Sequence, residues 1–556
     1  MYFKNKKGER AVFLLIFIIA SYLFFFYNLG EYSLKEPDEG RYAEIPREMV
    51  EKGNYIVPYL NYVRYFEKPP LLYWMTALSY KIFGINEWSF RFPNALVAFL
   101  CVIITYFSAA KRFNSKTALL SSLLLMSSFG LFAMSHIVTT DMLFTFLLFA
   151  SLLAFFEFYC SEKPFFLYCF FTALALAVLT KGLVAIILLG ATIFIFLLIE
   201  KKIFLLKKIL SVKGLLLFLA ISAPWFIVMC IKEKEFFQFF FVDQHFMRFI
   251  TTKHSRSGPL YYFLPVLFGG LFPWSIFIPR AVIHLWRIRE LRLFFIWSAV
   301  VFCFFSISGS KLPPYILPVF PALSIILGYL FKTEWEKPVH ENREIIIYGV
   351  FFVCTAAAGL ICGTNLFAEQ LKLFPDISSI APEIRGLSLG LSGASIIILF
   401  LLFFKKACTF RSLFYILGGF SLFVTTTLML HADVIDQFNT TKKLAQIINE
   451  RKTENYSVIN YGSYNQTLTF YIQGKTYLVN DTGELEMGSK HPDARKLFLN
   501  QDDFIRMFKS DYQVWVVFKA KRLTQLKELG VINKQEILCQ DNRCLISNKD
   551  FSSKKD

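Results

Sequence analysis

A charged segment rich in tyrosine and proline directly follows the first long apolar run of this chain. It contains Glu36-Pro37-Asp38-Glu39-Gly40-Arg41-Tyr42-Ala43-Glu44 and, further on, Arg64-Tyr65-Phe66-Glu67-Lys68-Pro69-Pro70. Charged side chains are costly to hold at a membrane boundary unless they are paired or used. Carboxylates can orient or deprotonate a substrate, and fixed cations can bind phosphate. The segment is therefore interpreted as the active-site loop of an enzyme that works at the lipid surface.

Two aspartates each have two interpretations. Asp38 precedes a helix-like stretch over residues 41–51, and Asp141 lies at the start of the apolar run over 142–160. Each can be a helix N-cap, whose side chain accepts a hydrogen bond from a free backbone amide. Each can also be a catalytic or substrate-orienting carboxylate. The spacing alone leaves both interpretations open.

Two proline-containing motifs suggest phosphate binding. Lys68 precedes Pro69, and a residue before proline is held extended, so its ammonium projects in a fixed direction that suits a lipid phosphate. The alternative is an interfacial ion pair between Lys68 and Glu67. The motif Lys311-Leu312-Pro313-Pro314-Tyr315 ends in a tyrosine whose hydroxyl could reach a phosphate. The alternative there is a proline-broken helix start, with Tyr315 in the aromatic belt of the membrane.

The histidines suggest a metal site and a basic patch. His245 lies among aromatic residues typical of an interfacial helix, and a lone histidine is usually not a ligand. Paired with Glu67 across loops, it would hold a divalent metal, because imidazole and carboxylate together suit such ions. Zinc is the first choice, with manganese or magnesium as alternatives. His254-Ser255-Arg256 is a basic loop patch that either binds phosphate or is simply solvated.

The elements that must position these residues are membrane spans. The chain has 556 residues, is 55% hydrophobic and contains 66 phenylalanines, and its mean hydropathy of +0.49 is too apolar for a soluble protein. Apolar runs of about 17–25 residues, the length that crosses a bilayer, recur from Ala11 to Leu430. The net charge of +18 lies mostly in short basic clusters between these runs. This is the positive-inside pattern and does not indicate a nucleic-acid interface.

The basic clusters place the N-terminus in the cytoplasm and predict about thirteen spans, with the C-terminus outside. The predicted spans cover residues 11–29, 90–110, 117–135, 142–160, 165–180, 183–199, 214–231, 260–279, 293–309, 315–331, 345–363, 387–404 and 412–430. The topology gathers these unusual polar residues at the outer face: Asp38, Glu67, Lys68, Asp141, His245, His254 and Lys311. Because they come from several loops, we expect one shared outer cavity.

The composition becomes that of a soluble domain after His431. Alternating strands and helices predict a small α/β domain over 432–556, beside a membrane domain over 1–431 whose outer loop covers 30–88. The expected helices cover 438–450, 502–508 and 522–529, and the expected strands cover 456–461, 476–479, 512–518 and 536–539. A local disulfide between Cys539 and Cys544 is favoured over a zinc pair, because no histidine lies nearby.

The two first-loop motifs resemble the first outer loop of the lipid A aminoarabinose transferases, within the protein-O-mannosyltransferase-like glycosyltransferases of the C-type fold. Thr139-Thr140-Asp141, His245-Phe246-Met247-Arg248-Phe249 and the motif from Lys311 to Tyr315 are similar to further motifs of that family. The resemblance covers nearly the whole chain. It implies an α-helical polytopic membrane protein of the bacterial inner membrane, with about thirteen transmembrane helices and a C-terminal periplasmic α/β domain.

The resemblance also implies a reaction. The sugar 4-amino-4-deoxy-L-arabinose would move from undecaprenyl phosphate to a lipid A phosphate at the periplasmic face, and direct displacement would invert the anomeric carbon. The implied roles are catalysis for Asp38 and its helper Asp141, binding of a divalent metal for Glu67 and His245, and binding of the donor phosphate for Lys68, Arg248 and Tyr315. Further substrate contacts are expected from Arg41, Tyr42, Tyr65, His254, Arg256 and Lys311.

Other functions stay open on the sequence alone. The same donor chemistry could serve another sugar, such as mannose, galactosamine or galacturonic acid, or a protein or polysaccharide acceptor. A lipid or solute transporter is a third interpretation, but the unusual charges gather at one face and no internal repeat is found. Nucleotide-binding and serine-nucleophile motifs are absent, so an activated lipid donor is expected to supply the energy. We expect a monomer that binds membrane lipid and no nucleic acid.

Overall fold

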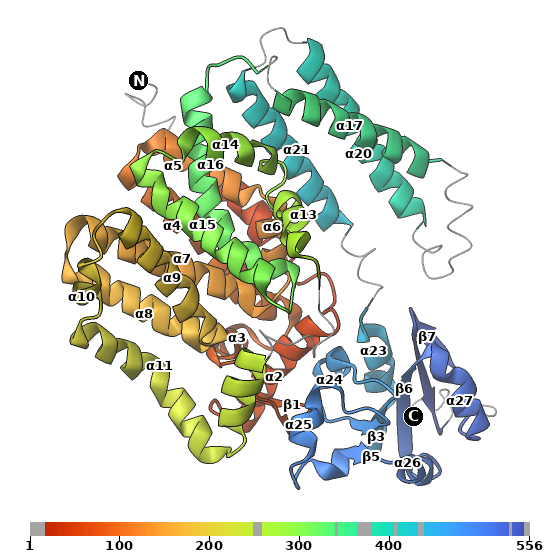
Figure 1. Cartoon of the computed structure of the whole chain (residues 1–556). Helices are drawn as coiled ribbons and strands as arrows, with labels where there is room; N and C mark the ends of the chain where they lie inside the picture. The colour runs from red at the N-terminus through yellow and green to blue at the C-terminus, as the bar shows by residue number, and fades with distance from the viewer. Residues whose placement is uncertain are drawn as a thin grey trace. The chain divides into compact units, whose positions relative to one another are not determined.

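The computed structural model describes residues 17–247, 258–339, 343–364, 381–404, 409–431, 439–532 and 536–549. The chain divides into two compact units. The membrane unit comprises Met1–Leu29 and Phe92–His431, and the mixed unit comprises Gly30–Arg91 and Ala432–Asp556. The predicted outer loop 30–88 therefore packs with the C-terminal residues in one unit (Figure 1).

The membrane unit is built from helices (Figure 1), and many of them are long and apolar. Its elements, the first of which begins in the mixed unit, are α4 (Glu87–Arg112), α5 (Ser115–Met126), α6 (Phe129–His136), α7 (Thr140–Ser161), α8 (Pro164–Lys181), α9 (Val184–Ile199), α10 (Leu205–Ile209), α11 (Val212–Lys232), η1 (Gln238–Met247), η2 (Leu260–Tyr262), α13 (Phe263–Gly270), η3 (Ser275–Phe277), α14 (Ile278–Leu285), α15 (Arg289–Ile307), η4 (Pro313–Val319), α16 (Phe320–Glu334), α17 (Arg343–Cys362), α20 (Ala381–Phe404) and α21 (Phe410–Leu430). A helix pairs its own backbone N–H and C=O groups by hydrogen bonds, and this is required inside a bilayer because lipid tails offer no hydrogen-bond partners.

The described residues contain nine helices long and apolar enough to cross a membrane, or up to eleven if each of two bent pairs is one span. The bent pairs are α5 with α6, at 57°, and Leu260–Gly270 with Ser275–Leu285, at 120°. The predicted span 183–199 is the shorter apolar helix α9, and the predicted span 11–29 begins outside the described residues. The polytopic helical fold is thus confirmed, whereas the count of thirteen stays a prediction.

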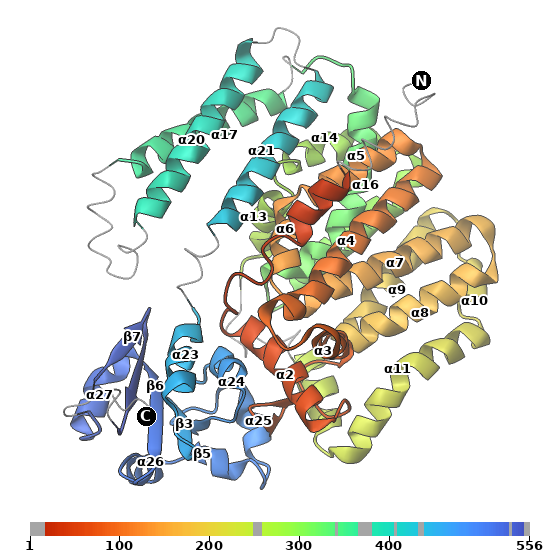
Figure 2. The same ribbon diagram turned by 180° about the vertical axis from the view of Figure 1, so that it is seen from behind.

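Neighbouring helices of the membrane unit pack closely. Figure 2 shows α7 beside α8, and α17 beside α20, as Figure 1 does from the opposite side. Helices α5 and α16 lie close together at Gly328, where an added Cβ would lie 2.7 Å from the backbone nitrogen of Ser121. Small residues at such contacts let helix backbones approach each other, which strengthens packing inside a bilayer.

The mixed unit joins two segments that are far apart in the chain. The first segment supplies α2 (Asp38–Lys52), β1 (Tyr59–Leu60), β2 (Val63–Arg64) and α3 (Leu71–Phe83). The second supplies α23 (Lys442–Arg451), β3 (Tyr456–Tyr461), α24 (Gln466–Ile472), β4 (Tyr477–Val479), η5 (Gly483–Leu485), α25 (Glu486–Ser489), η6 (Arg495–Leu497), β5 (Phe498–Leu499), α26 (Gln501–Phe508), β6 (Gln513–Lys519), η7 (Ala520–Arg522), α27 (Leu523–Glu528), β7 (Leu538–Gln540) and β8 (Arg543–Ser547).

A six-stranded sheet in the order β5-β4-β3-β6-β8-β7 forms the centre of the C-terminal segment. The strands from β5 to β6 pair in parallel, and β8 pairs antiparallel with β6 and β7. Strand β6 is buried on both faces, since Val514, Val516 and Phe518 enter one core while Trp515 and Val517 enter the other. Helices α26 and α27 cover the first core, and α23 and α24 cover the second.

The predicted α/β class of the C-terminal segment is confirmed. Strand β3 has the predicted bounds, and β4, β6 and β7 lie within a few residues of theirs. The short strand β5, the buried strand β8 and the helix α24 were not expected. The predicted disulfide between Cys539 and Cys544 is present, and it joins the paired strands β7 and β8.

Candidate active site

Asp38 is the first residue of α2, and Pro37 precedes it in the N-cap position. The helix has no side-chain cap, so the interpretation of Asp38 as an N-cap is wrong. The Asp38 carboxylate instead lies 3.3 Å from Nη1 of Arg41, one turn further along the helix, and its side chain is 53% exposed. Because Arg41 holds the Asp38 carboxylate in place and about half of the side chain is exposed, the carboxylate is accessible to a substrate.

Arg41 links Asp38 to the C-terminal segment of the mixed unit. Its Nε lies 2.5 Å from Oε2 of Glu484, in η5, as an ion pair without the geometry of a hydrogen bond. Both side chains are nearly buried, at 11% and 13% exposure. Glu484 also accepts hydrogen bonds from Gln466 Nε2 at 2.5 Å and from the Tyr65 hydroxyl at 3.3 Å. Arg41 is thus fixed between two carboxylates from opposite ends of the chain.

The pKa of Arg41 depends on its burial and on three neighbouring side chains that can carry a negative charge. Burial lowers the pKa of Arg41, but the groups around it, Tyr65, Glu484 and Glu67 above all, outweigh this and hold the pKa well above its usual value. Burial raises the pKa of Glu484, and Arg41 opposes that rise. Burial also raises the pKa of Tyr65 and of Tyr73 well above the usual value of a phenol.

The start of α2 is held by Glu36. Its buried carboxylate accepts hydrogen bonds from the backbone nitrogens of Gln466 and Thr467, both at 2.9 Å, and from the Thr467 hydroxyl at 2.5 Å. These amides belong to the first turn of α24, where a negative charge is favourable. An added Cβ at Gly40 would lie 2.6 Å from the Thr467 nitrogen, so the glycine of the motif allows α2 and α24 to approach each other.

A second buried ion pair joins α2 to the beginning of α4. Arg91 donates through Nε and Nη2 to the two carboxylate oxygens of Glu39, at 2.9 and 2.8 Å. Arg91 also donates to the backbone carbonyls of Tyr32 and Ser33, at 2.8 and 3.1 Å. The forked geometry matches a planar guanidinium to a planar carboxylate, and it fixes the helix that carries Asp38.

The remaining first-loop candidates lie around this network. Tyr42 is buried, with its ring centroid 6.0 Å from that of Tyr73. Glu67 and Lys68 lie in the bend between β2 and α3, and both are partly exposed. Both side chains are engaged in interactions within the structure.

In the membrane unit, Asp141 lies at the start of α7. Thr139 is the N-cap, and its hydroxyl accepts from the Asp141 backbone nitrogen at 3.3 Å, so the interpretation of Asp141 as an N-cap is wrong. The Asp141 carboxylate instead forms an ion pair of 2.5 Å with Nζ of Lys181, the last residue of α8. That ammonium lies 4.4 Å from the centroid of the Tyr315 ring.

Lys181 was not among the predicted site residues, although its position in the predicted topology is unusual. The predicted topology puts the turn after residue 180 at the outer face, where the positive-inside rule makes a lysine unusual. The ammonium of Lys311 is buried and donates to the Ser308 carbonyl at 2.7 Å, and its expected substrate contact stays a prediction. Lys311 therefore satisfies the carbonyl of the C-cap residue of α15.

The proposed metal pair is divided between the units. Glu67 belongs to the mixed unit, whereas His245 belongs to η1, a π-helix of the membrane unit, and its side chain is not described. Arg248, His254 and Arg256 lie outside the described residues. Within the described part of the chain, no group of three or more His, Cys, Asp and Glu could hold a metal ion. The metal site and the shared outer cavity both stay predictions.

Two family models match the chain. Residues 67–228 match the model described as dolichyl-phosphate-mannose-protein mannosyltransferase, and residues 444–548 match the aminoarabinose transferase C-terminal domain. The second match covers most of the C-terminal segment of the mixed unit. The first begins at Glu67 and runs through α7 and α8, which carry Asp141 and Lys181.

Relatives align along much of the chain. It is 31% identical over 369 residues to an uncharacterized protein of Aquifex aeolicus (strain VF5), covering 65% of this chain and 71% of the relative. It is 26% identical over 548 residues to the undecaprenyl phosphate-alpha-4-amino-4-deoxy-L-arabinose arabinosyl transferase of Photorhabdus laumondii, covering 94% and 96%. The same enzyme of Yersinia pestis (strain Pestoides F) is 26% identical over 523 residues, covering 90% and 91%.

A solved structure has the same fold throughout. The crystal structure of ArnT from Cupriavidus metallidurans bound to undecaprenyl phosphate superimposes with a TM-score of 0.83 and 26% identity, covering 97% of this chain and 98% of that one. The apo state of the same protein gives a TM-score of 0.82. Both the helical part and the α/β part therefore have counterparts in one solved chain.

Proposed function

Because the chain belongs to the aminoarabinose transferase family, we propose that it transfers 4-amino-4-deoxy-L-arabinose from undecaprenyl phosphate to a lipid A phosphate. It is a multi-pass membrane glycosyltransferase that uses a polyprenyl-phosphate sugar donor. The sugar is supported by the activity named for the relatives from Photorhabdus and Yersinia, whereas the acceptor is proposed from the resemblance of the sequence motifs. The lipid carrier is supported by the undecaprenyl phosphate in the similar crystal structure.

The proposed location is the bacterial inner membrane, with the N-terminus in the cytoplasm and the mixed unit in the periplasm. The alternating basic clusters support this orientation. So does the disulfide between Cys539 and Cys544, since such bonds form and persist in oxidising compartments.

The observation that carries the proposed mechanism is the half-exposed Asp38 carboxylate, held by a nearly buried Arg41. A phosphate acceptor is already ionised at neutral pH and needs no strong general base. Asp38 would therefore orient the reacting groups while the acceptor oxygen attacks the anomeric carbon. Direct displacement breaks the bond to the carrier phosphate and inverts that carbon.

The departing carrier phosphate gains negative charge as its bond to the sugar breaks. Lys68, Arg248 and Tyr315 would hold this phosphate, and fixed cations would lower the energy of the developing charge. Lys181, whose ammonium contacts both the Asp141 carboxylate and the ring of Tyr315, would hold Asp141 in a fixed orientation. Glu67 and His245 would hold a divalent metal, which would supply further neutralisation of the phosphate.

Mass spectrometry of lipid A tests the proposal. The full chain is expressed in a transferase-deficient Gram-negative host, beside Asp38→Ala and the control Glu486→Ala, whose side chain is 74% exposed. We expect a pentosamine on lipid A with the wild type and the control, and none with Asp38→Ala. Unmodified lipid A from wild-type protein that is verified in the membrane would exclude this sugar and acceptor. The glycosyltransferase class would then be tested with other sugars and hydroxyl acceptors.

A further inference from the structure

The carboxyl ends of the parallel strands β4, β3 and β6 form one edge of the sheet in the mixed unit (Figure 1). The chain leaves β3 for α24, whereas it leaves β6 through η7 for α27. These two helices cover opposite faces of the sheet. In open α/β sheets, ligands bind outside the carboxyl ends of the strands, where neighbouring connections diverge in this way. The edge between β3 and β6 is therefore the place where a bound group is expected.

The acids near this edge are already occupied. The Glu36 carboxylate accepts from the first backbone nitrogens of α24, so it takes the position of an anion there. Asp481, which follows β4, accepts from the backbone nitrogens of Tyr464 at 3.2 Å and Gly483 at 2.9 Å. Neither acid forms an ion pair with the arginine that follows β6, within the part of the chain that the structure describes.

Arg522, the last residue of η7, has one hydrogen-bond partner among the described residues, and that partner is neutral. Its Nη1 donates to Gln525 Oε1 at 3.0 Å, whereas its buried Nε has no partner there. An added Cβ at Gly462 would lie 3.1 Å from this Nε, so the glycine, with its φ of 68°, lets the guanidinium lie against the end of β3. Buried donors rarely stay unpaired, so the open side of the guanidinium calls for an acceptor.

Two hydroxyls at the end of β3 also lack a hydrogen bond within the described structure. They belong to Ser463 and to Tyr461, which the Asn480 carboxamide approaches without the geometry of a hydrogen bond. Burial raises the pKa of Tyr461, whereas Asn480 and Arg522 lower it, so the guanidinium lies close to the phenol. Ser463 and Arg522 are partly exposed, and a ligand can therefore reach them from solvent.

The charges around Arg522 favour an anion. Lys519, Lys521 and Arg522 follow one another closely, and no acid lies between Asp511 and Glu528. A ligand with several acceptor oxygens would meet both the guanidinium and the hydroxyls.

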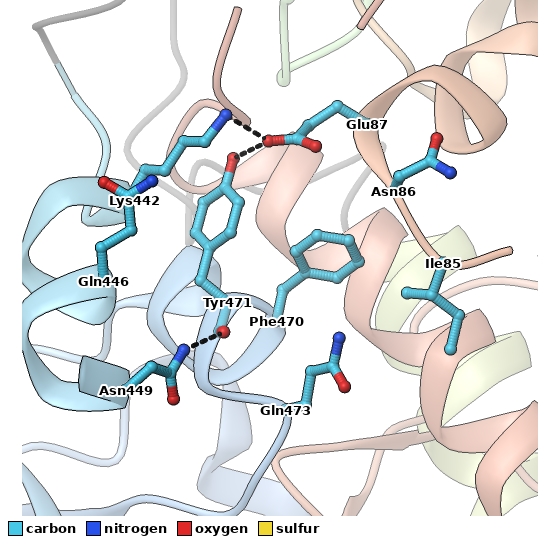
Figure 3. A pocket seen from close by; sticks show the side chains of 9 residues that line it. All are labelled: Ile85, Asn86, Glu87, Lys442, Gln446, Asn449, Phe470, Tyr471 and Gln473. Atoms are coloured by element: carbon cyan, nitrogen blue, oxygen red, sulfur yellow. Dashed lines mark hydrogen bonds and ion pairs between the residues drawn. The ribbon is translucent and has the colours of Figure 1, made fainter. Parts of the chain in front are cut away.

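A hollow at the start of α4 offers no comparable cation. Figure 3 shows its lysine, Lys442, paired with Glu87 at 2.7 Å, while the Tyr471 hydroxyl donates to the same carboxylate at 3.2 Å. An anion would have to break this ion pair before it could bind there. The guanidinium of Arg522 requires no such exchange.

We propose that Tyr461, Ser463 and Arg522, called here the Arg522 site, bind a phosphate group. A guanidinium presents its donors in a planar fork that matches phosphate oxygens, and the two hydroxyls can donate to the oxygens that remain. The assignment of this phosphate to the acceptor rests on the proposed function, in which the acceptor is a phosphorylated glycolipid.

The Arg522 site lies on the same edge of the sheet as part of the candidate active site. Glu484, which pairs with Arg41, follows β4, and Arg522 follows β6, two strands away. Two strand spacings correspond to roughly 10 Å. The Arg522 site therefore suits a second phosphate of the acceptor, held apart from the phosphate that reacts, and this contact would orient the acceptor.

The first test measures phosphate binding and needs no transfer. Hydrogen–deuterium exchange of the full chain in phosphatidylcholine nanodiscs is recorded with increasing inorganic phosphate at constant ionic strength. We expect protection of peptides that cover residues 460–466 and 519–526. Arg522→Gln should need about tenfold more phosphate for half-maximal protection, because it loses charge-assisted hydrogen bonds. Arg506→Gln, at a 77% exposed arginine of α26, is the matched control and should respond as the wild type does.

Arg522→Lys keeps the charge without the planar fork and should need an intermediate phosphate concentration. It tests the site even if Arg522→Gln fails to fold, which the thermal midpoint would reveal. Absence of protection in the wild type, or equal protection in all variants, would overturn the Arg522 site.

The second test identifies the source of the phosphate, from the KM of wild type and Arg522→Gln for acceptors with one or two phosphates. A KM about tenfold higher for the doubly phosphorylated acceptor alone, with unchanged kcat, assigns the site to the acceptor. Unchanged KM values beside phosphate-dependent protection would overturn that assignment and identify free phosphate as the ligand. Protection without any aminoarabinose transfer would contradict the proposed function and leave the Arg522 site standing, so the two failures are distinguishable.

Discussion

Arg41 and Glu484 form a nearly buried ion pair of 2.5 Å, although they lie at opposite ends of the chain. Arg41 also contacts Asp38, and Glu484 is held by Gln466 and Tyr65. The C-terminal segment therefore contributes a carboxylate to the surroundings of the proposed catalytic aspartate. It is part of the candidate site and more than an appended domain.

Glu484→Gln should lower the transfer rate about tenfold to a hundredfold, the loss that follows a small misplacement of an active-site group. The reason is that Arg41 would lose its opposing charge and shift relative to Asp38. The measurement is kcat and KM of the purified full chain, with the thermal midpoint recorded alongside. As a positioning residue, Glu484 should affect kcat more than KM.

A double-mutant cycle separates positioning from general damage. If Glu484 acts through Arg41, the loss in Glu484→Gln/Arg41→Gln should be smaller than the two single losses combined. Glu486→Gln, at an exposed carboxylate 3.9 Å from Lys490, serves as the control and should leave the rate unchanged. Additive losses would rule out the positioning role.

Lys181→Met should weaken transfer about tenfold or more, because it leaves the nearly buried Asp141 without its cation. Lys181→Arg keeps the charge and should retain part of the activity. Lys213→Met, at an exposed lysine near the start of α11, is the matched control. Wild-type kinetics in Lys181→Met would show that Asp141 does not depend on this pair.

The stability of the mixed unit should fall as the pH rises from about 4.5 to about 8. Burial, with the Glu44 carboxylate next, raises the pKa of Glu48 from 4.5 to about 8. The folded state therefore keeps a proton that the unfolded chain has lost, and the free energy of unfolding decreases with pH across this window. The check is the thermal midpoint at pH 5 and pH 9, compared with Glu48→Gln.

Glu48→Gln keeps an oxygen that can accept from the Tyr62 backbone nitrogen, which now donates to Glu48 at 2.9 Å. It removes the titrating group, so its midpoint should depend less on pH than that of the wild type. A wild-type midpoint that rises between pH 5 and pH 9 would contradict the assigned sign.

Purified protein should contain about one zinc ion per chain if Glu67 and His245 form the predicted site. Elemental analysis of Glu67→Gln and His245→Ala should show little zinc, whereas His284→Ala, at an exposed histidine of α14, should retain it. Removal of zinc by a chelator should slow transfer, and added zinc should restore it. Equal metal content in all variants would disprove the pair.

The membrane helices could be predicted from the sequence because each apolar run carries its own signal. A bilayer requires about 20 apolar residues per helix, and this requirement is local in the chain. Strand β3 was located for a similar reason, since its run of aromatic and β-branched residues lies between polar turns. Short β5 and buried β8 carry too few residues, or too mixed a pattern, for such recognition.

The candidate site could be predicted only in part. Asp38 and Asp141 stand out locally, but Pro37 and Thr139 occupy the cap positions, a shift of one residue for Asp38 and two for Asp141 that a pattern does not resolve. Glu484 and Lys181 could not be paired with their partners, because an ion pair between distant segments leaves no mark on either segment alone. Such partners become visible only when the chain is folded.

The buried carboxylate of Glu36 has a consequence for hybrid proteins. Among the described residues, the donors to this carboxylate come from α24, so a chimera that exchanges only the C-terminal domain would give the carboxylate a foreign partner. An unmatched partner would leave a charge buried without donors, which is strongly destabilising. Residues 30–91 and 432–556 pack as one unit, so a hybrid protein should take both segments from the same parent.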